Sequence, residues 1–250
     1  MATLRTDTGI QDHKVVPQSE WIEARTELLR KEKEFTKLRD ELSRQRRELP
    51  WERVEKPYVF EGPKGKETLS DLFNGRSQLV VYHFMFGPEW KEGCPSCSFL
   101  SDHIDGTLAH LNHHDVTLLG VSRAPLSKIE AFKRRMGWHF PWVSSFGSDF
   151  NFDYHVSATK EELAKGEMYY NYRVFKSRGE EQPGISVFYK DQSDNDRIYH
   201  TYSSYARGGD LLIGTYNYLD LTPKGRNEIN PNHIDWVRHH DKYDDGDATS

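Results

Sequence analysis

The stretch LVVYHFMF, residues 79–86, decides the fold. It is apolar and β-rich with little alternation, which is typical of a strand that is covered on both faces. A second run of this kind spans residues 116–122, and apolar side chains recur at helical spacing in residues 94–111 between the two runs. A strand, a helix and a strand at this spacing predict a βαβ unit with a parallel sheet.

The flanking segments extend this unit into a larger α/β domain. Residues 127–136 predict a helix in which Ser127 is the N-cap and Glu130 completes a capping box. Two β-rich runs, 185–190 and 197–205, are separated by a polar loop and predict a hairpin, and residues 210–219 predict a last helix. We therefore expect one α/β sandwich with a mixed central sheet over residues 51–243.

The N-terminal part has a different pattern. Residues 19–50 are dense in Glu, Arg and Lys, and an apolar residue recurs every seven positions, at Trp21, Leu28, Phe35, Leu42 and Leu49. This pattern predicts one long amphipathic helix that packs on the chain's own core or on a partner subunit, with a homodimer as one possibility. The second apolar position of the heptad is irregular, so a regular two-stranded coiled coil is not supported. We expect residues 1–18 and 244–250 to be flexible tails.

Composition excludes several classes of function. The chain has 250 residues, 34 Lys and Arg against 39 Asp and Glu, and a net charge of −5. This balance gives no electrostatic reason to expect binding to nucleic acid or to an anionic membrane. No apolar run approaches the roughly 20 residues that span a bilayer, and the first 20 residues contain no secretory signal core. We therefore expect a cytoplasmic globular protein.

The only two cysteines form the motif Cys94-Pro95-Ser96-Cys97. The motif follows the apolar strand and precedes the helical segment, so we expect Cys94 at a helix N-terminus, where a thiolate is stabilised. Cys97 lies one helical turn further, within reach of a disulfide. In a reducing compartment, a close pair of this kind is more often catalytic or metal-binding than structural.

A zinc site and an inert pair are the alternatives. Zinc normally needs four ligands, and the histidines at 110, 113 and 114 lie about 20 Å away if the intervening segment is one helix. We therefore expect no metal. We also expect no organic cofactor, because the sequence has no Gly-rich phosphate loop.

Several motifs carry a resemblance to known families. The CPSC motif after a strand resembles the thioredoxin-like superfamily, and residues 120–122, 140–145 and 152–156 resemble the alkyl-hydroperoxide-reductase and thiol-specific-antioxidant branch. More closely, the chain is similar to the DUF899 family, whose members are described as dithiol-disulfide oxidoreductases or isomerases of thioredoxin-like fold. The motifs for this similarity are residues 79–86, 93–98, 219–226 and 236–243.

The chain departs from these families at two points. A peroxiredoxin site resembles Pro-x-x-x-Thr-x-x-Cys, but Lys91 stands three residues before Cys94, so the hydroxyl that activates peroxide is missing. Thioredoxin-like proteins usually place a cis-proline against the cysteines. Pro183 is the candidate here, but it comes about two residues early and is otherwise an ordinary loop proline. Trp90, Pro95, Ser96 and Pro183 are candidates for a substrate groove, although Trp90 is equally suited to cap the core.

Three functional hypotheses follow. The first is a thiol-disulfide oxidoreductase in which Cys94 attacks a protein or small-molecule disulfide and Cys97 resolves the mixed disulfide. The second is a thiol peroxidase that uses the same two residues. The third is a thioredoxin-like binding or scaffold protein without enzymatic activity, suggested by the long helix and the aromatic C-terminal half.

Overall fold

The computed structural model describes residues 13–176, 179–228, 234 and 236–243. The chain divides into two compact units, one of residues 1–50 with 219–227 and one of residues 51–218 with 228–250. The second unit contains the sheet and both cysteines.

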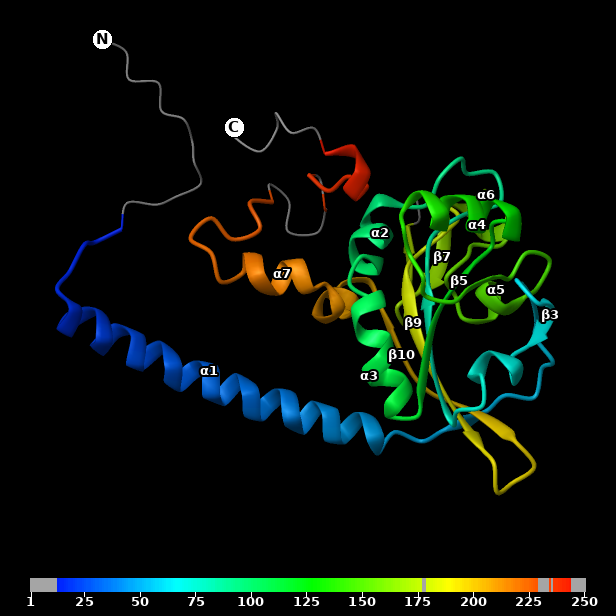
Figure 1. Ribbon diagram of the computed structural model, residues 1–250, viewed down its shortest axis with the longest axis horizontal. Coiled ribbons are helices and arrows are strands. Elements are labelled where there is room, and N and C mark those ends of the chain that lie inside the picture. Colours follow the sequence, from blue (N-terminus) through cyan, green and yellow to red (C-terminus); the bar gives the residue numbers. More distant parts are fainter. Residues whose placement is uncertain (1–12, 177–178, 229–233, 235, 244–250) are drawn as a thin grey trace, which may run out of the picture. The chain divides into compact units, whose positions relative to one another are not determined.

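The first unit is built around the long helix α1, Gln18–Arg47 (Figure 1). The expected N-terminal long helix is confirmed, although it ends at Arg47 rather than at Pro50. Ion pairs one turn apart, such as Arg30 with Glu27 and Arg44 with Glu41, lie along its surface. The apolar residues of the seven-residue repeat are exposed, with exposed fractions of 58% for Trp21 and 66% for Phe35.

The second unit is organised around an eight-stranded sheet of order β1-β10-β9-β4-β5-β6-β2-β3. The strands are β1 Glu52–Arg53, β2 Val59–Gly62, β3 Gly65–Thr68, β4 Gln78–His83, β5 Val116–Ser122, β6 Trp142–Ser144, β9 Gly184–Asp191 and β10 Arg197–Tyr205. β4 pairs in parallel with β5, and β5 in parallel with β6. β9 is antiparallel to β4 and to β10, which makes the sheet mixed.

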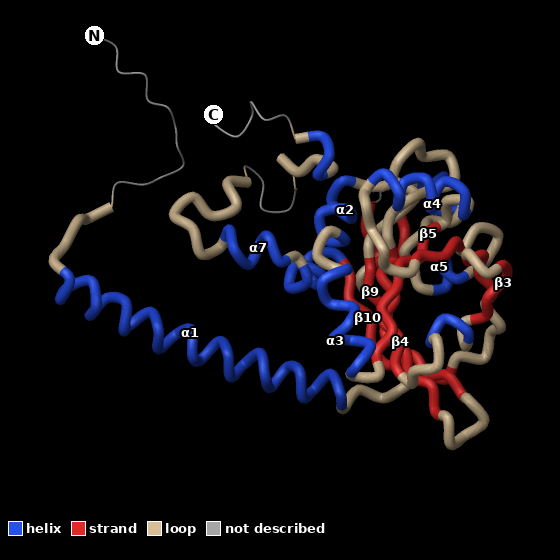
Figure 2. Tube along the Cα trace, viewed as in Figure 1, coloured by secondary structure: helices blue, strands red, loops and turns tan. Residues whose placement is uncertain are grey.

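The helices cover both faces of this sheet (Figures 1 and 2). α2 (Pro95–Ser101) and α3 (Leu108–His113) connect β4 to β5 on one face. α4 (Leu126–Arg135) and α5 (Phe150–Asp153) lie on the other. The four central strands in the order β10-β9-β4-β5, with a helical crossover after β4 and the β9-β10 hairpin, form the thioredoxin arrangement. The expected thioredoxin-like α/β sandwich with a mixed sheet is confirmed.

Some expected elements differ in detail. The single helix over 94–111 is two helices, α2 and α3, separated by the short 3-10 helix η2, Asp105–Thr107. α4 begins at Leu126 after Pro125, so Ser127 is inside the helix and the expected capping box is wrong. Residues 206–212 form the 3-10 helix η3, Ala206–Leu212, and α7 covers only Gly214–Leu219.

The remaining elements are small. They are η1 Asp71–Phe73, α6 Lys160–Lys165, β7 Glu167–Tyr170, β8 Arg173–Lys176 and η4 His240–Lys242. A capping box does occur at α6, where the Thr159 hydroxyl accepts from the Glu162 N–H and the Glu162 carboxylate accepts from the Thr159 N–H. β7 and β8 form a separate two-stranded sheet.

β4 is buried on both faces, as its apolar sequence requires. Leu79 and Val81 have no exposed surface and belong to a core cluster that also contains Phe150 and Phe188. Burial of an aliphatic side chain of this size contributes about 1.5–3 kcal/mol. This rigid strand leads directly into the segment that carries the cysteines. Within the described part of the chain, no helix is both long and apolar enough to cross a membrane.

Candidate active site

Cys94 is the N-cap residue of α2 and is half-buried. Pro95 follows at the first helical position, where its fixed φ favours helix initiation and its missing N–H costs no hydrogen bond. The carbonyl of Cys94 accepts hydrogen bonds from the backbone N–H and the hydroxyl of Ser98, at 2.9 Å each. The expected position of Cys94 at a helix N-terminus is therefore observed.

The surroundings of Cys94 favour its thiolate. A hydrogen bond from the Cys97 thiol lowers the pKa of Cys94 to about 7, with smaller contributions from the backbone N–H groups of Cys97 and Ser96 and from the Ser96 side chain. Burial opposes this shift but is outweighed. The Cys94 thiol is therefore more acidic than a free thiol.

Cys97 has the opposite character. It is only 1% exposed, and burial raises its pKa, with a further contribution from the hydrogen bond to Cys94. The buried phenol of Tyr82, on β4, also makes a hydrogen bond with the Cys97 sulfur, and this contact favours the thiolate of Cys97. The two thiols therefore differ in burial and in acidity.

Met85, two residues beyond β4, holds both ends of the motif. Its carbonyl accepts from the Cys94 N–H at 3.1 Å, and its N–H donates to the Cys97 sulfur at 3.4 Å. The end of the central strand therefore fixes the start of α2 relative to the sheet.

Gly93 is packed too tightly to carry a side chain. A Cβ atom here would lie 2.6 Å from the Phe84 ring and 2.8 Å from the Phe132 ring. These two rings belong to an aromatic cluster with Trp138 and Trp142, in which ring centroids lie 4.4–6.3 Å apart. Only glycine allows the chain to pass this cluster directly before Cys94.

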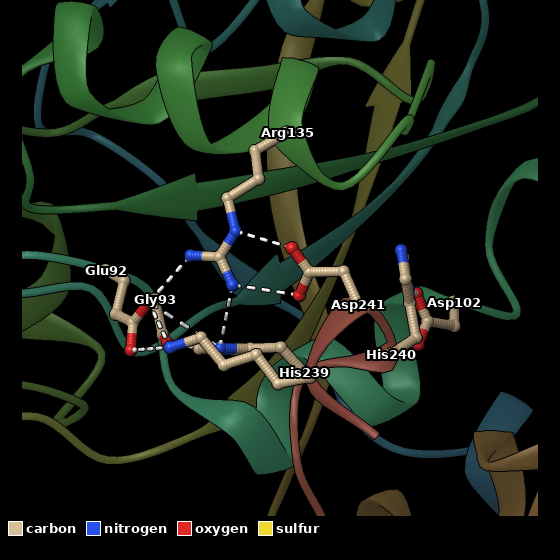
Figure 3. Close-up of polar contacts among 8 residues, drawn as sticks. Glu92, Gly93, Asp102, Arg135, His239, His240 and Asp241 are labelled. Atoms are coloured by element: carbon tan, nitrogen blue, oxygen red, sulfur yellow. Dashed lines mark hydrogen bonds and ion pairs between the residues drawn. The ribbon is translucent and has the colours of Figure 1, made fainter. Parts of the chain in front are cut away.

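The C-terminal segment, residues 236–243, packs against the active-site loop, residues 84–94, which connects β4 to α2 (Figure 3). The imidazole of His239 is 2% exposed, and its Nε2 is 2.8 Å from the Gly93 carbonyl oxygen. Arg135 of α4 donates to both carboxylate oxygens of Asp241, at 2.7 and 2.9 Å, and to Glu92 at 2.6 Å. Lys242 also donates to Glu92.

The four candidate groove residues differ in burial and in the groups that they contact. Trp90 is half-buried, and its indole packs against Gly87 in its own loop. Ser96 is half-buried and hydrogen-bonds to Cys94, whereas Pro95 is exposed. Pro183 precedes β9, whose Gly184 pairs with His83 at the end of β4. The peptide bond of Pro183 is trans, like the others between described residues, so the interpretation as a cis-proline is wrong.

Sequence reasoning did not single out Tyr82, His239 or Glu181 as site residues. Glu181 is 4% exposed, and burial raises its pKa to about 7 despite a hydrogen bond from Ser157 and an ion pair with Arg123 at 2.8 Å. It lies two residues before Pro183, and its contacts with Ser157 and Arg123 fix the segment that leads into β9. Among the described residues, no group of three or more His, Cys, Asp or Glu side chains is placed to bind a metal ion.

The sheet order and the cysteine pair at the start of α2 define a thioredoxin-fold protein with a Cys-x-x-Cys motif. Within that class, the chain belongs to the DUF899 family, described as "Bacterial protein of unknown function", which it matches over residues 10–243. No curated protein matches the chain.

Solved structures with a similar fold include two peroxiredoxins. A cysteine mutant of peroxiredoxin Q from Xanthomonas campestris is 16% identical, with a TM-score of 0.43, and the match covers 68% of this chain and 98% of that one. Peroxidoxin BcpB from Mycobacterium tuberculosis is 13% identical, with a TM-score of 0.42, and the match covers 67% of this chain and 95% of that one.

Proposed function

We propose that the protein is a thiol-disulfide oxidoreductase in which Cys94 is the attacking and Cys97 the resolving cysteine. The observation that carries this proposal is the difference between the two thiols. Cys94 is accessible and has a pKa of about 7, whereas Cys97 is buried and its pKa is raised. A dithiol with this asymmetry suits sequential attack and resolution.

In the first step, the Cys94 thiolate attacks one sulfur of a substrate disulfide. A bond forms between Cys94 and that sulfur, the substrate S–S bond breaks, and the second substrate sulfur leaves as a thiolate. The N–H groups at the start of α2 stabilise the Cys94 thiolate before attack. A pKa near 7 is favourable, because a thiol attacks best when its pKa is close to the ambient pH.

In the second step, Cys97 attacks the Cys94 sulfur of the mixed disulfide. Cys97 gives its proton to the substrate thiolate that left in the first step, and the hydrogen bond from Tyr82 stabilises the transient Cys97 thiolate. The bond between Cys94 and the substrate breaks as the Cys94-Cys97 bond forms, and the second substrate sulfur leaves as a thiolate that takes from solvent the proton that Cys94 had released. The substrate gains two electrons and leaves as two thiols, while the protein keeps a Cys94-Cys97 disulfide. A dithiol reductant then restores the reduced pair.

A trapping experiment tests this assignment. We expect Cys97→Ala to accumulate a mixed disulfide on Cys94 when it is treated with an aromatic disulfide that releases a coloured thiolate, one equivalent per protein. The wild-type protein should release two equivalents and end with an internal disulfide. Cys94→Ser is the control, and release from Cys94→Ser at the wild-type rate would exclude Cys94 as the nucleophile. Mass spectrometry locates the adduct.

The thiol peroxidase hypothesis differs from the oxidoreductase hypothesis in its substrate, which is a peroxide rather than a disulfide. There the Cys94 thiolate would attack a peroxide oxygen, form a sulfenic acid and release water or an alcohol, after which Cys97 would condense with it. Lys91 and Gly87 stand where the peroxiredoxin motif has Thr and Pro. Peroxide consumption far faster than disulfide reduction would favour the peroxidase, and full biological function without either cysteine would favour a binding protein.

We also propose that α1 mediates self-association. Trp21, Leu28, Phe35 and Leu42 recur every seven residues and are each 44–66% exposed. The other positions of α1 carry both acidic and basic residues, so a second copy can pack on the stripe without strong net repulsion. We place the protein in the cytoplasm, where a reduced dithiol is the resting state.

A further inference from the structure

The C-terminal segment contacts the active-site loop, and these contacts have no role in the two proposed thiol-disulfide exchange steps. It shares the second unit with the cysteines, and His239 is joined to Gly93 across 146 positions of sequence. The contact is polar and buried on both sides, since Gly93 and His239 both have little exposed surface. A buried hydrogen bond of this kind fixes the orientation of the groups that form it.

The group that His239 contacts is the peptide that enters Cys94. The Gly93 carbonyl oxygen lies 2.8 Å from His239 Nε2, and the N–H of the same peptide donates to the Met85 carbonyl at 3.1 Å. Both polar groups of this one peptide are therefore held from opposite sides. The plane of this peptide, together with the Cys94 φ of −61°, sets the direction in which the Cys94 side chain leaves the backbone at the start of α2.

The surroundings of His239 select one form of its ring. Because Nε2 faces a carbonyl, it carries the proton and donates, which leaves Nδ1 as an acceptor for the Arg135 guanidinium at 3.4 Å. The Phe132 ring packs against the imidazole with centroids 5.3 Å apart. Glu92 approaches Nδ1 to 3.7 Å but is itself paired with Arg135 and Lys242. The contacts with Arg135 and Phe132 thus orient the imidazole so that Nε2 faces the Gly93 carbonyl (Figure 3).

We propose that His239 is a positioning residue for Cys94, which holds the Gly93-Cys94 peptide so that the Cys94 sulfur meets the hydrogen-bond donors at the start of α2. The C-terminal segment is then part of the active site rather than a tail. This inference rests on the proposed function for its biological meaning, but its physical content concerns only the reactivity of the Cys94 thiol.

The test measures the pH profile of Cys94 alkylation by iodoacetamide, with peptide mass spectrometry to separate Cys94 from Cys97. We expect a midpoint near pH 7 for the wild-type protein. His239→Ala should raise this midpoint by about one unit, toward the value of about 8.5 of a free thiol, because the sulfur loses its alignment with its donors. His239→Gln should restore the wild-type profile, since its amide nitrogen reaches the position of Nε2, whereas the shorter His239→Asn should not.

His240→Ala is the matched control. His240 is the adjacent residue of the same type, and it contacts Asp102 at 2.7 Å rather than the cysteine loop. This variant should keep the wild-type profile, so a shift there would indicate a general loss of packing. An unshifted midpoint in folded His239→Ala would overturn the proposal. If His239→Ala does not fold, the alkylation profiles of His239→Gln and His239→Asn are compared instead. Equal profiles for these two variants would overturn the proposal.

The alkylation profile is independent of any substrate. If the expected shifts occur but no disulfide is reduced, the positioning role stands and the proposed function fails. If disulfides are reduced and the shifts are absent, the proposed function stands and the role of His239 fails.

Discussion

Cys94 and Cys97 differ in which groups face their sulfur atoms. Cys94 receives hydrogen bonds from Cys97 and from backbone N–H groups, whereas Cys97 is fully buried and receives hydrogen bonds from the Tyr82 phenol and the Met85 N–H. We expect Cys97→Ala to raise the pKa of Cys94, because the first and largest of these hydrogen bonds is removed. The pH midpoint of Cys94 alkylation checks this, and an unchanged midpoint would show that the helix N-terminus alone sets the pKa.

Gly93 gives a prediction about stability. Gly93→Ala places a Cβ within 3 Å of the Phe84 and Phe132 rings, so we expect a loss of about 1–3 kcal/mol in the free energy of unfolding. Gly106→Ala is the control, because no atom lies within 4 Å of its Cβ position and its backbone is unstrained. Urea unfolding of both variants measures the difference, and equal stability of the two would contradict the tight packing at Gly93.

At the level of elements, the C-terminal segment is held by charges that titrate at low pH. Hydrogen bonds from Lys242 and Arg135 lower the pKa of Glu92 to about 2, and those from Arg135 lower the pKa of Asp241 to about 2. Because both folded pKa values lie below the ordinary values of these carboxyl groups, their stabilisation is complete only above about pH 5 and is lost as the pH falls toward about 2.

We therefore expect Arg135→Met to lower the melting temperature at pH 6 more than at pH 3. Thermal melts of the wild-type and variant proteins at both pH values measure this difference. Arg134→Met on the same helix is the control. Its difference in melting temperature from the wild-type protein should be the same at pH 6 and at pH 3. A difference that stays constant with pH would show that Arg135 acts through packing rather than through these carboxylates.

The apolar stripe of α1 gives a prediction about assembly. Leu28→Glu places a charge within the seven-residue repeat, so we expect it to shift the protein from dimer to monomer in light scattering. Thr26→Glu adds the same charge two positions away, off the stripe, and should leave the dimer intact. A monomeric wild-type protein at all concentrations tested would rule out self-association through α1.

The sequence was informative where chemistry and local pattern coincide. The run 79–86 marked the central strand, and the CPSC motif after it indicated Cys94 at a helix start, because both signals lie within a few residues. The capping box expected at Ser127 does not form, because α4 begins at Leu126 with Pro125 as its N-cap, two positions before Ser127, and the observed box belongs to Thr159 at the start of α6. Local residue types alone do not show which of two candidate caps the backbone uses.

The parts that were missed depend on distant contacts. His239 lies in a polar run near the C-terminus, and nothing in its neighbours indicates that it meets Gly93. Tyr82 was recognised only as part of an apolar strand, since its contact with Cys97 requires α2 to fold back on β4. His239 and His240 are adjacent and of the same type, but His239 is buried against Gly93, whereas His240 is exposed and contacts Asp102 at the end of α2.

In the complete fold, we expect the cysteine pair at the end of β4 to act as a reversible two-electron dithiol. The sheet fixes Met85, Met85 fixes both cysteines, and the C-terminal segment closes the loop from the other side. This arrangement has a redox function only if the pair forms a disulfide at potentials that cells reach.

The most direct test is the reduction potential of the Cys94-Cys97 pair, measured by thiol trapping of the purified protein in a series of glutathione and dithiothreitol ratios. We expect a single reversible two-electron transition between about −300 and −120 mV, the range of cellular dithiol proteins. The absence of a disulfide at every ratio would contradict the account.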